Sequence, residues 1–241
     1  MNWKCLLLPL GLLAQPAHAQ KPKLNLRLQH QLDSLDRAYR RYEQRTDAAF
    51  EQNQADSLLQ PIYLPNGALA GYKPKTATGP VRWEMPPDSS DLHFVTALIR
   101  RYGYPGKSLV GRPASEIVWQ VLQRTGHTTR FLPQLRVAAE TGEISYQLYA
   151  QAVDTQLMRA GKAQRYGTQV VACMLVNKAS GQVDMVRFLW PVADVRRANE
   201  LRRRAGFSTT VAQNAQLQSV SAEPVSLNYA LRMKHAAETG E

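Results

Sequence analysis

The sequence predicts an α+β protein that is mostly α-helical, with about five helices and one β-hairpin, preceded by an N-terminal helix and an irregular proline-rich arm. Two observations predict this class. Between residues 89 and 160, apolar residues recur at helical spacing in segments bounded by capping residues and glycines. From residue 169 to 190 the pattern changes to two runs of β-forming residues, separated by Lys178-Ala179-Ser180-Gly181.

Residues 1–19 have the features of a cleavable signal peptide. Lys4 precedes an apolar run from Cys5 to Leu13 that is too short to span a bilayer. Ala17-His18-Ala19 then supplies small residues at the two positions that a signal peptidase reads. We therefore expect a chain that begins near Gln20, has no transmembrane segment, and resides in the periplasm or outside the cell.

The charge balance favours anionic partners. The chain has 30 basic and 19 acidic residues, and the loss of Lys4 with the signal leaves a net charge of +10. Such a surface attracts anionic lipids, envelope glycans or nucleic acid. Of these, we do not expect nucleic acid to be the partner. Five arginines gather between Arg196 and Arg204. They favour either a solvated helix face or a polyanion-binding helix.

The first ninety residues divide into two parts. Residues 20–59 are predicted to contain an amphipathic helix, because apolar residues from Leu28 to Tyr42 follow one stripe. We expect that stripe to pack on the main domain, with a coiled-coil contact as the alternative. Residues 60–88 hold six prolines and three glycines, which predict a linker or irregular arm.

Residues 89–207 are predicted to form one globular domain. We expect helices that begin at Ser90 or Asp91, at Ser115, near Phe131, at Ser145 and at Asp194, the last of these ending at Gly206. A hairpin lies between the fourth and fifth helices. Three residues are expected in the core or at its edge: Trp119, Cys173 and Trp190. Residues 208–241 are predicted to be a polar tail with one short helix near Tyr229–His235.

One segment is distinctive: Gly161-Lys162-Ala163-Gln164-Arg165-Tyr166-Gly167-Thr168-Gln169. It resembles the Gly-Lys-x-Gln-x-Tyr-Gly-Thr-Gln signature of an uncharacterised bacterial family, a domain of unknown function found in many exported proteins. Other parts of residues 89–207 agree with that pattern, including Pro191 to Phe207, which places Asp194, Arg202 and Gly206. The resemblance brings no established activity with it.

The chain departs from the family pattern at positions that bear on chemistry. Where the family has Gln-His-Ala-Asp, this sequence reads Gln123-Arg124-Thr125-Gly126. If that histidine and aspartate act as acid–base groups or metal ligands in relatives, this chain has lost them. No other catalytic motif, metal-ligand spacing or phosphate-binding glycine loop stands out. We therefore expect neither a metal nor a cofactor.

A candidate ligand-binding site is assembled from amides, hydroxyls, one carboxylate and one guanidinium. These groups suit hydrogen bonding to a polar or anionic ligand but supply no neutral-pH base. The structural alternative is that they only stabilise the crossing from helix to strand. The site comprises Gln123, Asp154, Gln164, Tyr166, Thr168, Gln169 and Arg202.

Three functions follow from these observations. The first is a non-enzymatic binding or interaction module of the cell envelope, with a polar or anionic envelope ligand or protein as its partner. The second is a hydrolase of envelope polymers, or a degenerate relative of one. It would be favoured by a close pairing of His127 with Asp154 or Glu116. The third is a polyanion binder that uses the Arg196–Arg204 helix.

Overall fold

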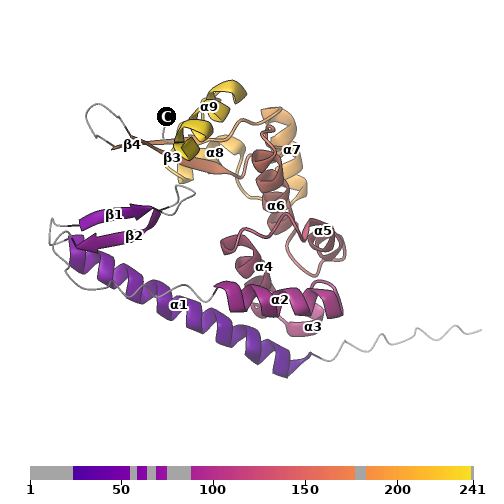
Figure 1. Ribbon diagram of the computed structural model, residues 1–241. Helices are drawn as coiled ribbons and strands as arrows, with labels where there is room; N and C mark the ends of the chain where they lie inside the picture. Colours follow the sequence, from indigo (N-terminus) through magenta and orange to yellow (C-terminus); the bar gives the residue numbers. More distant parts are fainter. Residues whose placement is uncertain (1–23, 55–58, 64–68, 75–87, 177–182, 240–241) are drawn as a thin grey trace, which may run out of the picture.

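The computed structural model describes residues 24–54, 59–63, 69–74, 88–176 and 183–239. The described part is mostly α-helical and contains an antiparallel hairpin, which confirms the α+β class at that level (Figure 1). Residues 1–23 lie outside it, so the predicted signal peptide does too. No described helix is both long and apolar enough to span a membrane.

The first half of the fold is a helical layer built on α1 (Leu26–Gln54), which runs along one side of the molecule (Figure 1). Leu28 and Leu32 of α1 are buried and Leu35 packs against them. They contact the core formed by α2 (Asp88–Tyr102), α3 (Lys107–Val110) and α4 (Ala114–Arg124). The first part of the predicted stripe therefore packs on the main domain.

Two further helices complete this layer. Helix α5 (Leu132–Glu140) packs against α6 (Tyr146–Arg159). Ser145 caps α6 as predicted, because its side chain accepts a hydrogen bond from the backbone N–H of Gln147. Ser115 does not cap α4: it lies inside the helix, buried, and Pro113 precedes the first turn.

The second half of the fold surrounds the hairpin of β3 (Val170–Val176) and β4 (Val183–Leu189), paired in register from Val170 with Leu189 to Val176 with Val183. Cys173 and Trp190 are buried there, as predicted, and Trp119 is buried in the first half. Helix α7 (Val195–Arg204) follows, with Asp194 as its cap.

The structure differs from the sequence prediction in three segments. The tail contains α8 (Val211–Leu217), which was not predicted, and α9 (Leu227–Thr239), which extends the short helix expected near Tyr229–His235 and packs on the hairpin with Ala230 fully buried. The proline-rich arm is not confirmed, because β1 (Leu59–Tyr63) and β2 (Leu69–Pro74) pair as a second hairpin and the rest lies outside the described residues. The short α3 was not predicted either, and the expected number of helices is therefore not confirmed.

Candidate functional site

The signature segment forms the connection from α6 to β3. Helix α6 ends at Arg159 with Ala160 as its C-cap, and Gly161 follows with a φ of +67°, in the left-handed region that glycine adopts readily. Gln164 then forms a parallel bridge with Val192, so the segment is tied to the chain that leaves β4. The turn at residues 165–168 lies between this bridge and α6. The polar side chains that form hydrogen bonds in it or at its ends include Asp154, Gln164, Thr168 and Arg202.

Asp154 of α6 organises the turn. Its side chain is fully buried, and its two oxygens accept five hydrogen bonds of 2.8–3.2 Å. The donors are the backbone N–H groups of Arg165, Tyr166 and Thr168 and the hydroxyl of Thr168. Asp154 therefore accepts the hydrogen bonds that backbone carbonyl groups would accept in a helix or a sheet.

Gln164 joins the turn to the hairpin. Its side chain is fully buried, and its Oε1 accepts from the N–H of Gln169 at 2.6 Å. Its Nε2 donates to the carbonyls of Gln169 at 3.0 Å and Trp190 at 2.6 Å. Gln169 immediately precedes β3 and Trp190 immediately follows β4, so Gln164 links the turn to this end of the hairpin.

Arg202 of α7 closes the turn from the other side. Its guanidinium donates to the carbonyls of Tyr166 at 3.0 Å and Gly167 at 3.3 Å. It also donates to the carbonyl and hydroxyl of Thr209, both at 2.7 Å, and lies over the ring of Phe207 at 4.4 Å. Asp154 thus satisfies the amide groups of the turn and Arg202 satisfies its carbonyl groups.

Burial dominates the electrostatics of this cluster. It raises the pKa of the Asp154 carboxyl, while the N–H groups of Tyr166, Arg165 and Thr168 act in the opposite direction. Burial also lowers the pKa of Arg202, and the nearby charge of Asp154 counteracts this. It raises the pKa of the Tyr166 hydroxyl to about 12. Two opposite charges therefore lie buried on the two sides of one turn.

The structure brings six of the seven predicted site residues together. Four of them, namely Asp154, Gln164, Tyr166 and Arg202, are buried. Thr168 and Gln169 are half-buried, and the Gln169 Nε2 donates to Thr168 and to the carbonyl of Gln151. Gln123 is exposed on α4 and makes no side-chain hydrogen bond to the cluster among the described residues. Ligand binding at the cluster stays a prediction, and its contacts favour the structural alternative.

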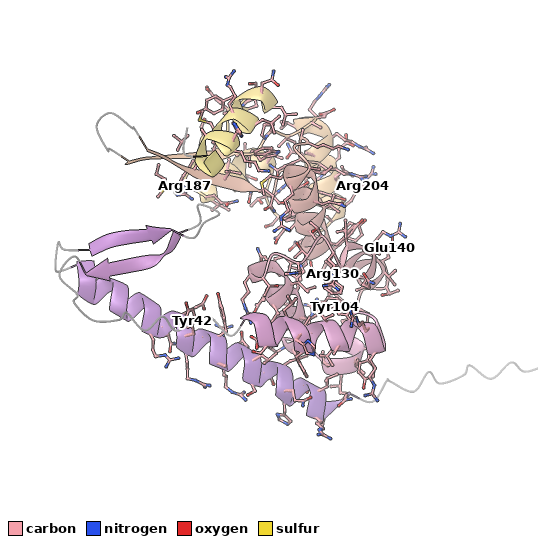
Figure 2. All side chains as sticks on the ribbon, viewed as in Figure 1. Tyr42, Tyr104, Arg130, Glu140, Arg187 and Arg204 are labelled. Carbon is pink, nitrogen blue, oxygen red and sulfur yellow. The ribbon has the colours of Figure 1, made fainter. Side chains whose placement is uncertain are left out.

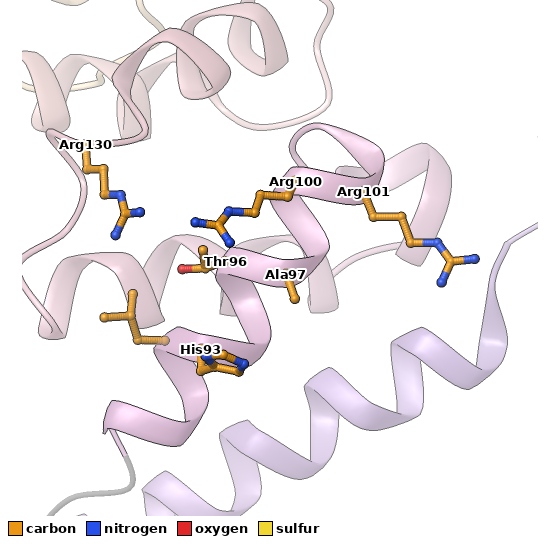
Figure 3. A pocket seen from close by; sticks show the side chains of 7 residues that line it. His93, Thr96, Ala97, Arg100, Arg101 and Arg130 are labelled. Carbon is orange, nitrogen blue, oxygen red and sulfur yellow. The ribbon is translucent and has the colours of Figure 1, made fainter.

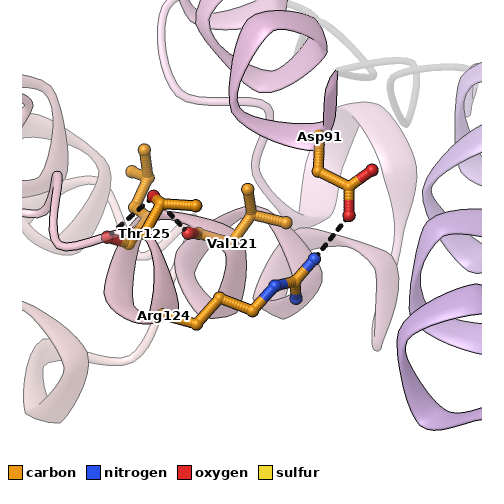
Figure 4. Close-up of polar contacts among 5 residues, drawn as sticks. Asp91, Val121, Arg124 and Thr125 are labelled. Carbon is orange, nitrogen blue, oxygen red and sulfur yellow. Dashed lines mark hydrogen bonds and ion pairs between the residues drawn. The ribbon is translucent and has the colours of Figure 1, made fainter. Parts of the chain in front are cut away.

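Arg124 joins three helices. Its guanidinium donates to the Asp91 carboxylate of α2 at 2.6 Å (Figure 4). Its centre also lies 3.9 Å from the centroid of the Tyr39 ring of α1. Arg124 and Asp91 are 12% and 4% exposed, so this is a largely buried ion pair. Arg124 therefore helps to pack α1, α2 and α4 against one another.

The acid–base pairs that a hydrolase would need are not formed at the expected positions. The carboxylate of Asp154 is directed to the turn, whereas the Nδ1 of His127 lies 2.6 Å from the Thr125 carbonyl. Glu116 faces Arg112 at 3.9 Å. In the described ranges, no three histidine, cysteine, aspartate or glutamate side chains are grouped to hold a metal ion.

A basic groove on α2 was not predicted. It has a volume of about 570 Å³ and is lined by His93, Thr96, Arg100 and Arg101 of α2 and by Arg130 from the segment before α5 (Figure 3). Leu92 and Ala97 supply its apolar wall. Among the described residues, no acidic side chain lines the groove.

The cations of this groove are not neutralised within the described part of the chain. Arg100 and Arg130 are exposed and form no ion pair there. Arg130 lies over the Phe131 ring at 5.3 Å and Arg101 over the Tyr102 ring at 5.1 Å. Figure 3 shows Arg100 and Arg130 extending toward one another, while Arg101 points toward α1.

The sequence contained half of the signal for this groove. His93, Thr96 and Arg100 are spaced three and four apart, which places them on one face of a helix. Val95, Leu98 and Ile99 bury the opposite face. Arg130 is thirty residues further along, and no pattern connects it with α2. Only tertiary packing of the α4–α5 connection brings it there.

Comparisons with known proteins find no relative. No family model matches the chain, and neither the curated proteins nor the solved structures contain a match. The resemblance to the uncharacterised bacterial family therefore stays a prediction, and the argument for function rests on the residues themselves.

Proposed function

We propose that this chain is an exported, non-enzymatic binding module of the cell envelope that holds an anionic ligand in the groove on α2. One observation carries the proposal. Arg100 and Arg130 extend into the same groove of about 570 Å³, and none of the described residues that line it is acidic. By contrast, the exposed Arg197 on α7 is paired with Glu200 at 2.8 Å.

The physical argument is that converging guanidiniums repel one another unless an anion lies between them. Each guanidinium is a planar donor that binds carboxylate or phosphate oxygens with charge-assisted hydrogen bonds. A concave site strengthens these bonds, since it removes competing water from one side of the ligand. A groove of this volume lies within the range of small-molecule sites, about 300–1,000 Å³.

The arginine-rich helix is a weaker candidate for the same activity. Of its five arginines, Arg202 is buried in the turn and Arg197 is paired with Glu200. Arg203 and Arg204 are exposed, and Arg204 lies on the outside of the molecule (Figure 2). This helix presents no concave surface among the described pockets.

The proposal is tested by titrating the protein with tripolyphosphate in a calorimeter at 50 and 200 mM salt. The Arg100→Ala/Arg130→Ala variant should lose at least tenfold in affinity. Arg203→Ala/Arg204→Ala is the matched control, because it removes the same charge from α7, and it should stay within about twofold. Binding of the unmodified protein should weaken with salt.

Three other outcomes would contradict the groove as the site. A loss confined to the α7 variant would assign binding to the arginine-rich helix. Equal small losses in both variants would indicate diffuse attraction to a basic surface. No binding by the unmodified protein would leave the groove without an anionic ligand.

Export is part of the proposal and has its own test. Expressed in a bacterium, the full chain should be recovered from the periplasm or the medium with residues 1–19 removed. Mass spectrometry of its N-terminus should find Gln20 first. A chain that keeps Met1 and stays with the cytoplasmic fraction would contradict the envelope location.

A further inference from the structure

Three hydrogen-bond donors converge in the basic groove from different elements. Arg100 comes from the last turns of α2, and Arg130 comes from the segment that precedes α5. Thr96 lies between them on α2, one turn before Arg100 (Figure 3). Its side chain is half-buried, and its hydroxyl makes no hydrogen bond within the described ranges.

The directions of these donors favour a tetrahedral anion over a planar one. A carboxylate carries two oxygens in one plane, and a single guanidinium satisfies both of them side by side. A phosphoryl group directs its oxygens to several sides at once. It can therefore accept from a guanidinium on either side and from a hydroxyl beneath.

The size and the other walls of the groove indicate more than a free phosphate ion. A volume of about 570 Å³ leaves room for an organic group beside the anion. Leu92 and Ala97 offer apolar surface to that group. His93, one turn before Thr96, provides a ring nitrogen that can donate to or accept from a hydroxyl.

We infer that the groove binds a phosphate ester, with the phosphoryl group between Arg100, Arg130 and Thr96 and the organic group along Leu92 and Ala97. This inference rests on the proposed function and specifies its ligand class. Soluble phosphate esters and phospholipid headgroups share this chemistry. The experiment separates these two sources.

The first measurement compares two probes of equal charge by calorimetry. Phenyl phosphate and phthalate both carry an aromatic ring and a charge close to −2 at pH 8, but only the first is tetrahedral at its anionic centre. We expect phenyl phosphate to bind at least tenfold more tightly. Co-sedimentation with vesicles of phosphatidylglycerol, against phosphatidylcholine alone, tests the headgroup as the source.

The second measurement removes the third donor. Thr96→Val keeps the shape of the side chain and deletes the hydroxyl, so it should weaken phenyl phosphate three- to tenfold and leave phthalate unchanged. Thr155→Val on α6 is the matched control, since Thr155 is a half-buried helical threonine outside the groove. It should change neither affinity.

The outcomes separate this inference from the proposed function. Phenyl phosphate binding that depends on Thr96 supports a soluble ester, and vesicle binding lost in Arg130→Ala supports a headgroup. If phthalate binds as tightly as phenyl phosphate and the Arg100→Ala/Arg130→Ala variant binds neither, the phosphoryl inference is overturned. The groove is then a site for anions in general. If tripolyphosphate binds but neither probe and neither vesicle does, the phosphate-ester inference is overturned and the anion site remains. If tripolyphosphate fails as well, both proposals are overturned.

Discussion

At the scale of single residues, a few buried polar side chains determine the conformation of the signature turn. Asp154 replaces the backbone partners that three N–H groups would have in a helix or sheet. Arg202 does the same for two carbonyl groups. These partners stabilise the turn, because a buried polar group left without one costs about 1–3 kcal/mol.

Asp154→Asn should lower the free energy of unfolding by about 3 kcal/mol. The amide keeps the size of the side chain, but its NH₂ group would face N–H donors where an oxygen now accepts. Urea unfolding measures the change. The control is Asp194→Asn at the exposed cap of α7, which should lose less than about 0.5 kcal/mol because asparagine caps helices equally well. Equal losses in both variants would contradict a special role for Asp154.

Gly167 and Gly103 allow backbone strain to be separated from crowding. Both have positive φ, +66° and +71°, but a Cβ at Gly167 would lie 2.9 Å from Val211, whereas none of the described atoms lies within 4 Å at Gly103. Gly103→Ala should therefore lose about 1 kcal/mol from strain alone. Gly167→Ala should lose about 3 kcal/mol, since α8 must also move. Thermal unfolding of the two variants, each against the unmodified protein, checks the difference.

At the scale of elements, the ion pair of Arg124 and Asp91 joins α4 to α2, and Tyr39 of α1 stacks on the same guanidinium. Buried pairs of this kind contribute little beyond a hydrophobic replacement, but breaking one leaves a charge in the core. The pair therefore works as a constraint on which helix faces meet.

A double-mutant cycle with Asp91→Asn and Arg124→Gln should give a coupling energy above about 1.5 kcal/mol. The matched cycle uses Arg136→Gln and Glu140→Gln on α5, an exposed pair at 3.9 Å. It should give less than about 0.5 kcal/mol. Chemical denaturation supplies the four free energies of each cycle. Coupling at Asp91 as weak as that on α5 would show that burial does not strengthen the pair.

At the scale of the whole molecule, buried tyrosines connect stability to alkaline pH. Burial raises the pKa of Tyr166 to about 12, and it also raises the pKa of Tyr104, whose hydroxyl donates to the Ser115 carbonyl. An unfolded chain ionises these groups near pH 10. Between these values the unfolded state has lost protons that the folded state keeps, so stability falls as the pH rises.

For Tyr166 alone, the loss between pH 10 and 12 should be about 2–3 kcal/mol. Denaturant midpoints measured at half-unit pH steps would reveal it. Tyr166→Phe removes the titrating hydroxyl and should reduce the slope, and the remainder includes Tyr104 and Tyr149, whose pKa burial also raises. A slope that Tyr166→Phe leaves unchanged would assign the alkaline loss to other groups.

Local patterns were enough to predict most of the described helices and the β3–β4 hairpin. Periodicity, capping residues such as Ser145 and Asp194, and the glycines after α6 and α7 act over one or two turns, so they can be read from neighbours in the chain. Of the two helices in the polar tail, α9 contains the short helix expected near Tyr229–His235 and is longer than predicted, and α8 was missed because it has only seven residues. They are helical in the structure through packing, as Ala230 against the hairpin shows.

The sequence by itself determined the fold class, the grouping of Asp154 with the signature, and the excess of positive charge. Only the tertiary structure decided that the signature side chains are turned inward to satisfy one turn, and that Arg100 and Arg130 share a groove. The physical reason is the sequence separation of the residues that interact. Helix and strand formation depends on residues a few positions apart, whereas a binding surface depends on which distant segments the packed core holds side by side.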